Sequence, residues 1–311
     1  MTDAPPQPEG PWAIQRQVKW KVPKSKLEVP LDKALKNVNA FLASSPSEEQ
    51  RMVVLVSSGA FSPIHKSHLQ LLEDAKKYCE SDGKSKVVAG YLSPSDDRSV
   101  KGKLQGDWIE AKHRIEMCKI AVQDSDWLDV SDWESGHRGW SSPTMLLNHI
   151  AAYIEQNSSS SANLFPIFVC SAEHAAQYNL FAQTSLEVIA VARSAHVDSL
   201  REAILGKKAQ IKTRVPTKEK AEGEDEGEEE EEEEEETRLV VEGEVSGRLS
   251  ALFHLVASGT MEEGGDIEDG LDGVAVQLRK KIKAGEEAEE SVVPAAVAAY
   301  LKQHRDALFG K

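Results

Sequence analysis

Two histidines stand three residues apart where the sequence changes from a strand pattern to a helix pattern. His65 and His68 end the segment GAFSPIHKSH, which begins at Gly59. A glycine lets backbone amides approach a ligand closely, and the start of a helix attracts phosphate through its unpaired N–H groups and its dipole. Two imidazoles can add hydrogen bonds to phosphate oxygens. The spacing indicates a phosphate site and leaves a metal site or simple packing open as alternatives.

Other kinds of chemistry have weaker support. A zinc site is disfavoured because no third cluster of ligands is evident. Cys79, Cys118 and Cys170 are widely spaced with no CxxC pair, which argues against a disulfide scaffold and favours a reducing compartment, the cytosol or the nucleus. No serine lies in the G-x-S-x-G elbow of a hydrolase. The carboxylates of GGDIEDGLDG lack the spacing of a calcium-binding EF-hand loop.

Strand and helix patterns alternate along the chain. Apolar runs predict strands at residues 51–58, 86–94, 127–133, 163–172 and 186–194. Helical spacing of apolar residues predicts helices at 31–43, 68–80, 108–124, 143–156, 197–208 and 293–309. The alternation predicts an α/β fold, a Rossmann-like doubly wound parallel sheet covered by helices on both faces. Ligands bind beyond the carboxyl ends of such strands, so the segments that follow the strands should converge on one cleft.

The chain is predicted to contain one large domain with an interruption. Residues 1–50 are expected to be an N-terminal extension and residues 51–311 the domain, with an insertion at 207–270. Within the insertion, Glu222–Glu236 holds 13 of the 52 acidic residues, and the chain without it is nearly neutral. Such a tract should be disordered and solvated over about 218–237. A contact with basic partners is the functional alternative.

Several classes of protein are disfavoured by composition. No apolar run reaches the roughly 18 residues that a membrane-spanning helix needs, and the N-terminus lacks the pattern of a secretory signal. No basic patch with interleaved aromatic residues is present, so nucleic-acid binding is not expected.

The pattern G-x-F-x-P-x-H-x-x-H resembles the signature of the nucleotidylyltransferase superfamily. It is complete here in Gly59, Phe61, Pro63, His65 and His68. Four further segments are similar, in order, to the nicotinamide/nicotinate mononucleotide adenylyltransferases of that superfamily. They are GYLSPSDD (90–97), KHRIEMCKIAV (112–122), WLDVSDWES (127–135) and VPAAVAAYLKQH (293–304). The resemblance covers roughly residues 52–206 and 273–308, and the Trp-Glu-Ser stretch is its most specific part.

The resemblance implies an enzyme of NAD biosynthesis. The 5′-phosphate of nicotinamide or nicotinate mononucleotide would attack the α-phosphorus of ATP in line, giving NAD and pyrophosphate, with Mg²⁺ bridging phosphates and no covalent intermediate. ATP and the mononucleotide are therefore the expected partners, and a homo-oligomer is left open. The alternatives are a nucleotidylyltransferase with another acceptor and a catalytically weakened nucleotide-binding protein.

The resemblance also implies roles for individual residues. His68 would stabilise the developing charge, with His65 beside it. The substrate-binding residues would be Ser58, Gly59, Ala60, Phe61, Lys101, Lys103, Trp133 and Glu173. Of these, Lys101 or Lys103 would meet the phosphate of the mononucleotide, and Trp133 would line the pocket of its base. No protein ligand to a metal is implied.

The chain departs from the family at its second phosphate motif. Ser-Ser-Thr-x-x-Arg aligns with VAVQLR, residues 274–279, which keeps Arg279 but replaces the hydroxyls with apolar side chains. We expect Arg279 to be catalytic. The rival placement, VDSLR ending at Arg201, keeps one serine but comes too early in the chain to precede the C-terminal helix. The lost hydroxyls put the affinity for ATP in doubt.

A second departure follows the strand at 163–172. The family's Gly-x-Asp is replaced by Ser171, Ala172 and Glu173, and Glu173 could supply the carboxylate that binds the ribose hydroxyls. The family usually stacks a tryptophan on the nicotinamide ring in the loop beyond, where this chain has none. Tyr178 or Phe181 is the candidate replacement, and a place in the core is the alternative for both.

Overall fold

A computed structural model gives the structure of the protein. It describes residues 29–47, 50–81, 83–137, 141–158, 164–178, 180, 186–193, 240–241, 253–258 and 270–309. The helix predicted at 197–208, the acidic tract, Arg201 and Phe181 lie outside these residues, so the expectations about them stay predictions. Within the described part of the chain, no helix has both the length and the apolar character to span a membrane.

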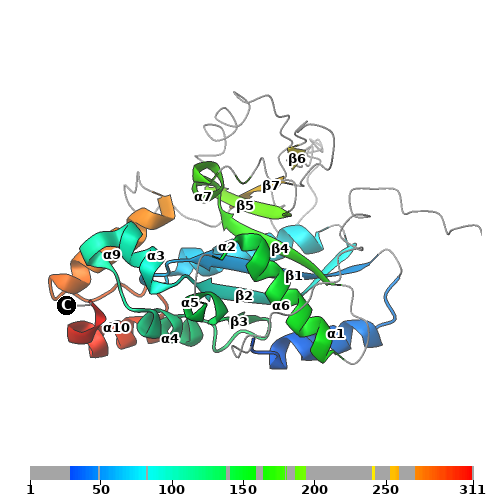
Figure 1. Ribbon diagram of the computed structural model, residues 1–311, viewed down its shortest axis with the longest axis horizontal. Coiled ribbons are helices and arrows are strands. Elements are labelled where there is room, and N and C mark those ends of the chain that lie inside the picture. The colour runs from blue at the N-terminus through cyan, green and yellow to red at the C-terminus, as the bar shows by residue number, and fades with distance from the viewer. Residues whose placement is uncertain are drawn as a thin grey trace, which may run out of the picture.

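Seven strands form one sheet in the order β3-β2-β1-β4-β5-β7-β6 (Figure 1). They are β1 (Arg51–Gly59), β2 (Ser85–Pro94), β3 (Leu128–Val130), β4 (Leu164–Ser171), β5 (Val188–Arg193), β6 (Val240–Val241) and β7 (Phe253–Ser258). All neighbouring pairs are parallel except β6 and β7. The strand order reverses between β1 and β4, which is the switch point where a doubly wound sheet binds ligands. The predicted fold class is confirmed.

Helices cover both faces of this sheet. One apolar core lies beneath α1 (Asp32–Ala43), α5 (Trp133–Gly136), α6 (Pro143–Asn157) and α7 (Ala172–Gln177). The other lies beneath α2 (Lys66–Glu80), α4 (Ala111–Ala121), α9 (Gly270–Lys283) and α10 (Ala295–Leu308). Figure 1 shows α6 crossing one face of the sheet. The short helices α3 (Asp97–Leu104), η3 (Gln105–Asp107), α5 and α7 were not predicted.

The central strand β1 shows why the strands read as continuous apolar runs. Met52, Val54 and Val56 face one core, whereas Val53 and Leu55 face the other. Successive side chains of a strand point to opposite faces, so a strand buried on both faces must be apolar throughout. The predicted run at 51–58 follows from this burial.

Helix α1 joins the described part of the N-terminal extension to the sheet. Ala34 and Val38 are buried in the same core as β1. The Lys33 ammonium donates to the carbonyl of Leu128 at 2.7 Å, and the Tyr91 hydroxyl of β2 donates to the carbonyl of Pro30 at 2.7 Å. The described part of the extension is thus packed into the domain.

Strand β7 lies inside the interval that was expected to interrupt the fold. It pairs in parallel with β5 over six residues, from Val188 opposite Phe253 to Arg193 opposite Ser258. His254, Val256 and Ser258 are buried. The expectation that 207–270 is only an insertion is therefore corrected, because part of it extends the sheet. The segment FHLVAS was overlooked because its apolar run is short and its surroundings are rich in glycine and glutamate.

Gly90 in β2 has no room for a side chain. A Cβ there would lie 2.5 Å from the Trp127 ring and 2.7 Å from a methyl carbon of Leu128. We expect Gly90→Ala to lower the free energy of unfolding by about 1–3 kcal/mol, the usual cost of overpacking, measured by urea denaturation. Gly102→Ala in α3 is the matched control, because a Cβ there meets no atom within 4 Å. Equal stability of the two variants would contradict this packing.

Candidate active site

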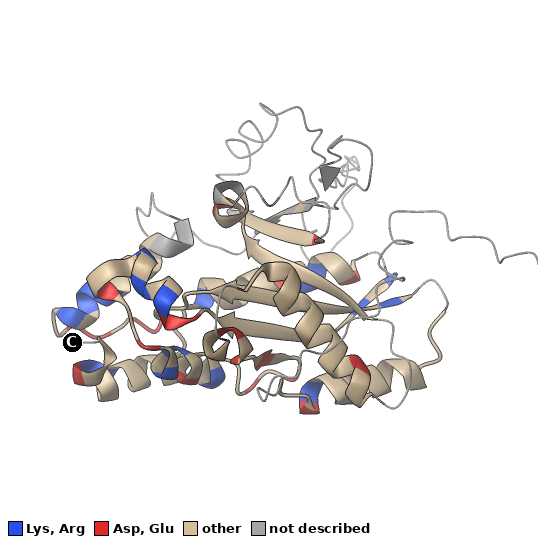
Figure 2. Cartoon of the chain, viewed as in Figure 1, with Lys and Arg blue, Asp and Glu red and all other residues tan. Residues whose placement is uncertain are grey.

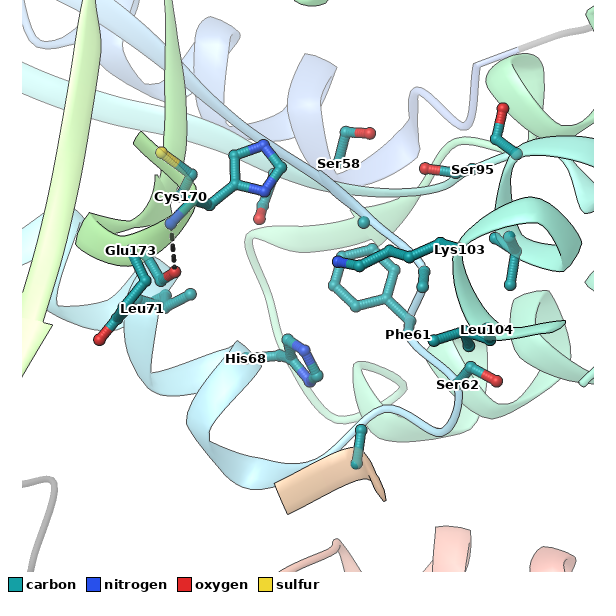
Figure 3. Close-up of a pocket in the computed structure, with 18 of the residues that line it drawn as sticks. Ser58, Phe61, Ser62, His68, Leu71, Ser95, Lys103, Leu104, Cys170 and Glu173 are labelled. Atoms are coloured by element: carbon teal, nitrogen blue, oxygen red, sulfur yellow. Dashed lines mark hydrogen bonds between the residues drawn. The ribbon is translucent and has the colours of Figure 1, made fainter. Parts of the chain in front are cut away.

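A cavity of about 240 Å³ lies at the carboxyl ends of β1 and β4. Its walls come from the β1–α2 loop, α3, the β4–α7 junction and α9. The predicted site residues that line it are Ser58, Gly59, Ala60, Phe61, His68, Lys103, Glu173 and Arg279. Figure 3 labels five of them: Ser58, Phe61, His68, Lys103 and Glu173. The segments that follow different strands therefore converge, as the parallel sheet requires.

His65 and His68 form a reciprocal cap at the start of α2. His65 is the N-cap residue, and its backbone carbonyl accepts the N–H of His68 at 3.0 Å. In return, Nδ1 of His68 accepts the backbone N–H of His65 at 3.2 Å. The second bond is the return half of a capping box, which glutamate usually supplies behind a serine or threonine. The spacing of three residues thus has a structural reason as well as a chemical one.

The cap determines which nitrogen of His68 can serve a ligand. Nδ1 is an acceptor in the cap, so the proton of the neutral ring lies on Nε2. Burial lowers the pKa of His68 well below its ordinary value, and the nearby His65 and Lys103 lower it further. The ring is therefore neutral near pH 7 and presents one N–H donor. His65 is fully buried and does not line the cavity, so its contact with His68, with ring centroids 3.7 Å apart, is a supporting one.

The loop before α2 contains a strained residue. Phe61 has a φ of 43°, in the left-handed region that costs a residue with a side chain roughly 1–2 kcal/mol. Its ring is only 3% exposed and meets the edge of the His68 ring, with centroids 5.0 Å apart. Burial of the ring offsets the strain and packs Phe61 against the wall that carries His68. Gly59 has neither a positive φ nor a steric need for glycine, because a Cβ there would make only an ordinary contact at 3.5 Å.

Lys103 brings an ammonium group over the cavity. Helix α3 starts after Asp96, whose side chain accepts two N–H groups of the first turn. Figure 3 shows the Lys103 side chain reaching from α3 across Phe61, on the wall opposite His68. Lys101 does not line the cavity, and its ammonium lies 5.8 Å from the centroid of the Trp108 ring. Of the two predicted lysines, the structure brings only Lys103 to the site.

Arg279 reaches the same cavity from α9. It is 3% exposed, and its Nη1 donates to the carbonyl of Ser62 at 2.6 Å. Ala275 lines the cavity one turn earlier, where the family's motif carries a hydroxyl. Figure 2 shows the lysines and arginines of α3 and α9 gathered at this end of the molecule. Of the residues that line the cavity, Lys103 and Arg279 are cationic, and α9 contributes Ala275 and Arg279 without a hydroxyl.

A second cavity of about 320 Å³ adjoins the first. The two share Ser58, Ser99, His174 and Tyr178 as lining residues. Glu134 lines the second cavity and accepts hydrogen bonds from the hydroxyls of Ser58 at 2.7 Å and Ser93 at 3.0 Å. Burial raises the pKa of Glu134, and these hydroxyl donors oppose that shift. Sequence analysis missed Glu134, although the Trp-Glu-Ser stretch contains it.

Trp133 does not line either cavity, contrary to expectation. Its side chain is fully buried, and its ring stacks between those of His137 and His149, each with its centroid 4.6 Å away. The reason is geometric, because Trp133 begins α5 with its ring facing the core while Glu134 faces the cavity. Trp133 was predicted to line a pocket, but its neighbour Glu134 is the residue that lines the second cavity.

The sequence of the chain matches a known protein family. A family described as cytidylyltransferase-like matches residues 56–223, more than half of the chain. The chain belongs to the cytidylyltransferase-like family.

Individual relatives share shorter stretches. The chain is 38% identical over 97 residues to nicotinamide/nicotinic acid mononucleotide adenylyltransferase 2 of Xenopus tropicalis, covering 31% of this chain and 30% of that protein. It is 39% identical over 103 residues to the corresponding enzyme 1 of Bos taurus, covering 33% and 35%. The chain thus matches about a third of the length of these relatives. These matches confirm the predicted resemblance.

One solved structure covers more of the chain. It is the Plasmodium falciparum nicotinic acid mononucleotide adenylyltransferase complexed with APC, which aligns with a TM-score of 0.47 and 11% identity, covering 82% of this chain and 97% of that one.

The stacked histidine beneath the site should make stability depend on pH. Burial, together with nearby His137, lowers the pKa of His149 to about 4. The unfolded chain binds this proton below about pH 6.5 while the folded chain does not, so stability falls as pH falls from about 6.5 to 4. His149→Phe keeps the stacked ring and removes the titration.

Between pH 6.5 and 4.5, we expect the variant to lose less free energy of unfolding than the wild type by on the order of 2 kcal/mol. Urea denaturation at several pH values measures this. Parallel pH profiles for the two proteins would show that His149 does not titrate in this way.

Proposed function

We propose that the chain transfers the adenylyl group of ATP to the 5′-phosphate of nicotinamide or nicotinate mononucleotide. The observation that carries the proposal is the convergence of His68, Lys103 and Arg279 on one cavity beside the β1–α2 loop. Each side chain comes from a different helix, and each offers N–H donors. Such an arrangement suits a triphosphate, whose charge increases on the leaving group as the reaction proceeds.

The chemistry requires no covalent intermediate. An oxygen of the 5′-phosphate attacks the α-phosphorus of ATP, the bond from that phosphorus to the bridging oxygen breaks, and pyrophosphate leaves with the electron pair. Gly59 and Ala60 line the cavity, and backbone amides at the start of a helix can bind phosphate oxygens. The Nε2–H of His68 can donate to the oxygen on which charge develops, and Lys103 and Arg279 can stabilise the pyrophosphate. Catalysis by such groups consists of positioning and charge stabilisation.

The Mg²⁺ that this chemistry uses would arrive with ATP. Within the described residues, no group of three or more His, Cys, Asp or Glu side chains could hold a metal ion. Mg²⁺ keeps several waters and is commonly held through substrate phosphates. The side chains present fit that arrangement, with cationic groups around the phosphates and the ion bound to phosphate oxygens.

The second cavity suits the acceptor. It adjoins the first through four shared residues, so a ligand in each would bring two phosphates close together. Glu134, Tyr178 and His174 offer it a carboxyl group and two rings. Glu173 lines the first cavity, and its carboxylate can accept hydrogen bonds from ribose hydroxyls, the role that the family's aspartate would have. Adenylyl transfer to another acceptor is the second candidate, because no tryptophan lines the described part of either cavity.

His68→Ala tests the proposal directly. We expect kcat with ATP, Mg²⁺ and the preferred mononucleotide to fall about 10²–10³-fold, since one donor to the transition state is lost. Formation of the dinucleotide, followed by chromatography, measures it. Lys101→Ala is the matched control, because Lys101 lies on α3 outside the cavity. If the wild type makes no product from either mononucleotide, the acceptor is wrong. If pyrophosphate exchange with ATP is also absent for other acceptors, the adenylyl transfer is wrong.

The lost hydroxyl on α9 predicts a gain of function. Ala275 lines the cavity, so Ala275→Ser should return a donor for the triphosphate and lower the KM for ATP by roughly five- to tenfold, the effect of about 1 kcal/mol from one hydrogen bond. Leu278→Met, a buried change on the same helix, is the control for general effects. An unchanged KM in Ala275→Ser would mean that the triphosphate does not reach this turn of α9.

A further inference from the structure

Arg114 is a buried arginine that neither cavity contains. It lies on α4 and is 0% exposed, yet it remains charged because a guanidinium does not lose its proton in proteins. A buried charge is costly unless it is paired and hydrogen-bonded. Its contacts therefore indicate what the protein gains from placing it there.

The guanidinium makes four hydrogen bonds. Nε donates to the carbonyl of Ile109 at 2.8 Å, and Nη1 donates to the carbonyl of Ala60 at 2.9 Å. Nη2 donates to the carbonyl of Ser95 at 2.7 Å and to Oδ1 of Asp97 at 2.9 Å. Ala60 belongs to the loop after β1, Ser95 belongs to the loop after β2, and Asp97 is the first residue of α3, into which that loop leads. One planar group thus connects the two loops.

These loops form much of the site. Ala60 and Ser95 both line the first cavity, and the loop after β2 leads into α3, which carries Lys103. One direct backbone bond links the starts of the two loops: the N–H of Ser95 donates to the carbonyl of Gly59, the last residue of β1, at 2.9 Å. Arg114 adds a bond to each loop, at Ala60 and at Ser95, without lining the cavity itself.

We propose that Arg114 is a positioning residue for adenylyl transfer, which fixes the phosphate-facing loop after β1 relative to the loop after β2 that leads to Lys103. The kinetic part of this inference rests on the proposed function. Donors held on separate loops must keep their distance from one another to within a fraction of an ångström, because a misplacement of about 1 Å can cost 10²-fold in rate. A rigid fork that bonds to both loops meets that need.

Lysine is the informative substitution at this position. Arg114→Lys keeps the charge but presents a single nitrogen in place of the fork, so it cannot reach acceptors on both loops in the same geometry. We expect kcat to fall about 10–10²-fold while the KM for ATP changes less, because the loss concerns alignment in the transition state. Amide hydrogen exchange at residues 59–64 and 95–99 should become about tenfold faster, as local opening becomes easier.

Arg51→Lys is the matched control. Arg51 starts the central strand β1 at its amino end, whereas the cavity lies at its carboxyl end, and its Nε donates to Ser85 Oγ at 2.7 Å. It should leave exchange in both loops at the wild-type rate. Asp97→Ala is a second variant that removes one contact of the fork. It should speed exchange at 95–99 but not at 59–64, and it keeps the proposal testable if Arg114→Lys does not fold.

The outcomes separate the two proposals. Wild-type exchange in both loops of Arg114→Lys, or in 95–99 of Asp97→Ala, overturns the positioning role, as does equal acceleration by Arg51→Lys. Faster exchange confined to the two loops supports it. A wild-type protein that makes no product from either mononucleotide contradicts the proposed function, whereas the exchange rates still decide the role of Arg114.

Discussion

The loop after β1 can face a phosphate only if its carbonyl oxygens are hydrogen-bonded elsewhere. A buried carbonyl without a donor costs about 1–3 kcal/mol, and a carbonyl turned toward the cavity would repel phosphate. Three elements supply the donors. The N–H of Ser95 bonds to Gly59, Arg114 of α4 bonds to Ala60, and Arg279 of α9 bonds to Ser62. The arrangement of strands β1 and β2 and helices α4 and α9 around this loop follows from that requirement.

The two histidines also combine a structural contact with a possible ligand contact. His65 caps α2 and is buried, and His68 completes the cap with Nδ1 while Nε2 remains for a ligand. Burial of the ring lowers the pKa of His68, and nearby His65 and Lys103 lower it further. A bound triphosphate would oppose both effects, because a nearby negative charge favours the protonated ring. A bound anion would therefore shift the pKa of His68 upward from the lowered value that it has in the empty cavity.

Sequence reasoning succeeded where a local rule and the tertiary structure agree. The run at 51–58 is apolar because β1 is buried on both faces, and the helix at 143–156 begins at Pro143 behind the N-cap Ser142. It was incomplete where a pattern is shared by several structures. The apolar run of strand β7 is short and lies near a stretch rich in glycine and glutamate, so by sequence it could equally belong to a loop. Its pairing with β5 shows that it is a strand.

The candidate site shows the same limit at the level of single side chains. The motif pointed to the β1–α2 loop and to His68, and alignment favoured Arg279 over Arg201. Neither could choose between Lys101 and Lys103, because the two differ by 200° around a helix axis and the facing direction depends on how α3 packs. The packing of α5 likewise decides which of two neighbouring side chains reaches the cavity. The indole ring of Trp133 is buried in the core, whereas Glu134 lines the second cavity.

The sequence by itself therefore determined the alternation of strands and helices, the turn with its two histidines after the first strand and the apolar residues before Arg279, because each depends on residue type and spacing along the chain. Only the tertiary structure decided that Arg279 and His68 share a cavity, that β7 completes the sheet and that Arg114 joins two loops. These are contacts between residues about 20 to more than 200 positions apart, and no local pattern encodes which distant backbone group a buried donor will meet.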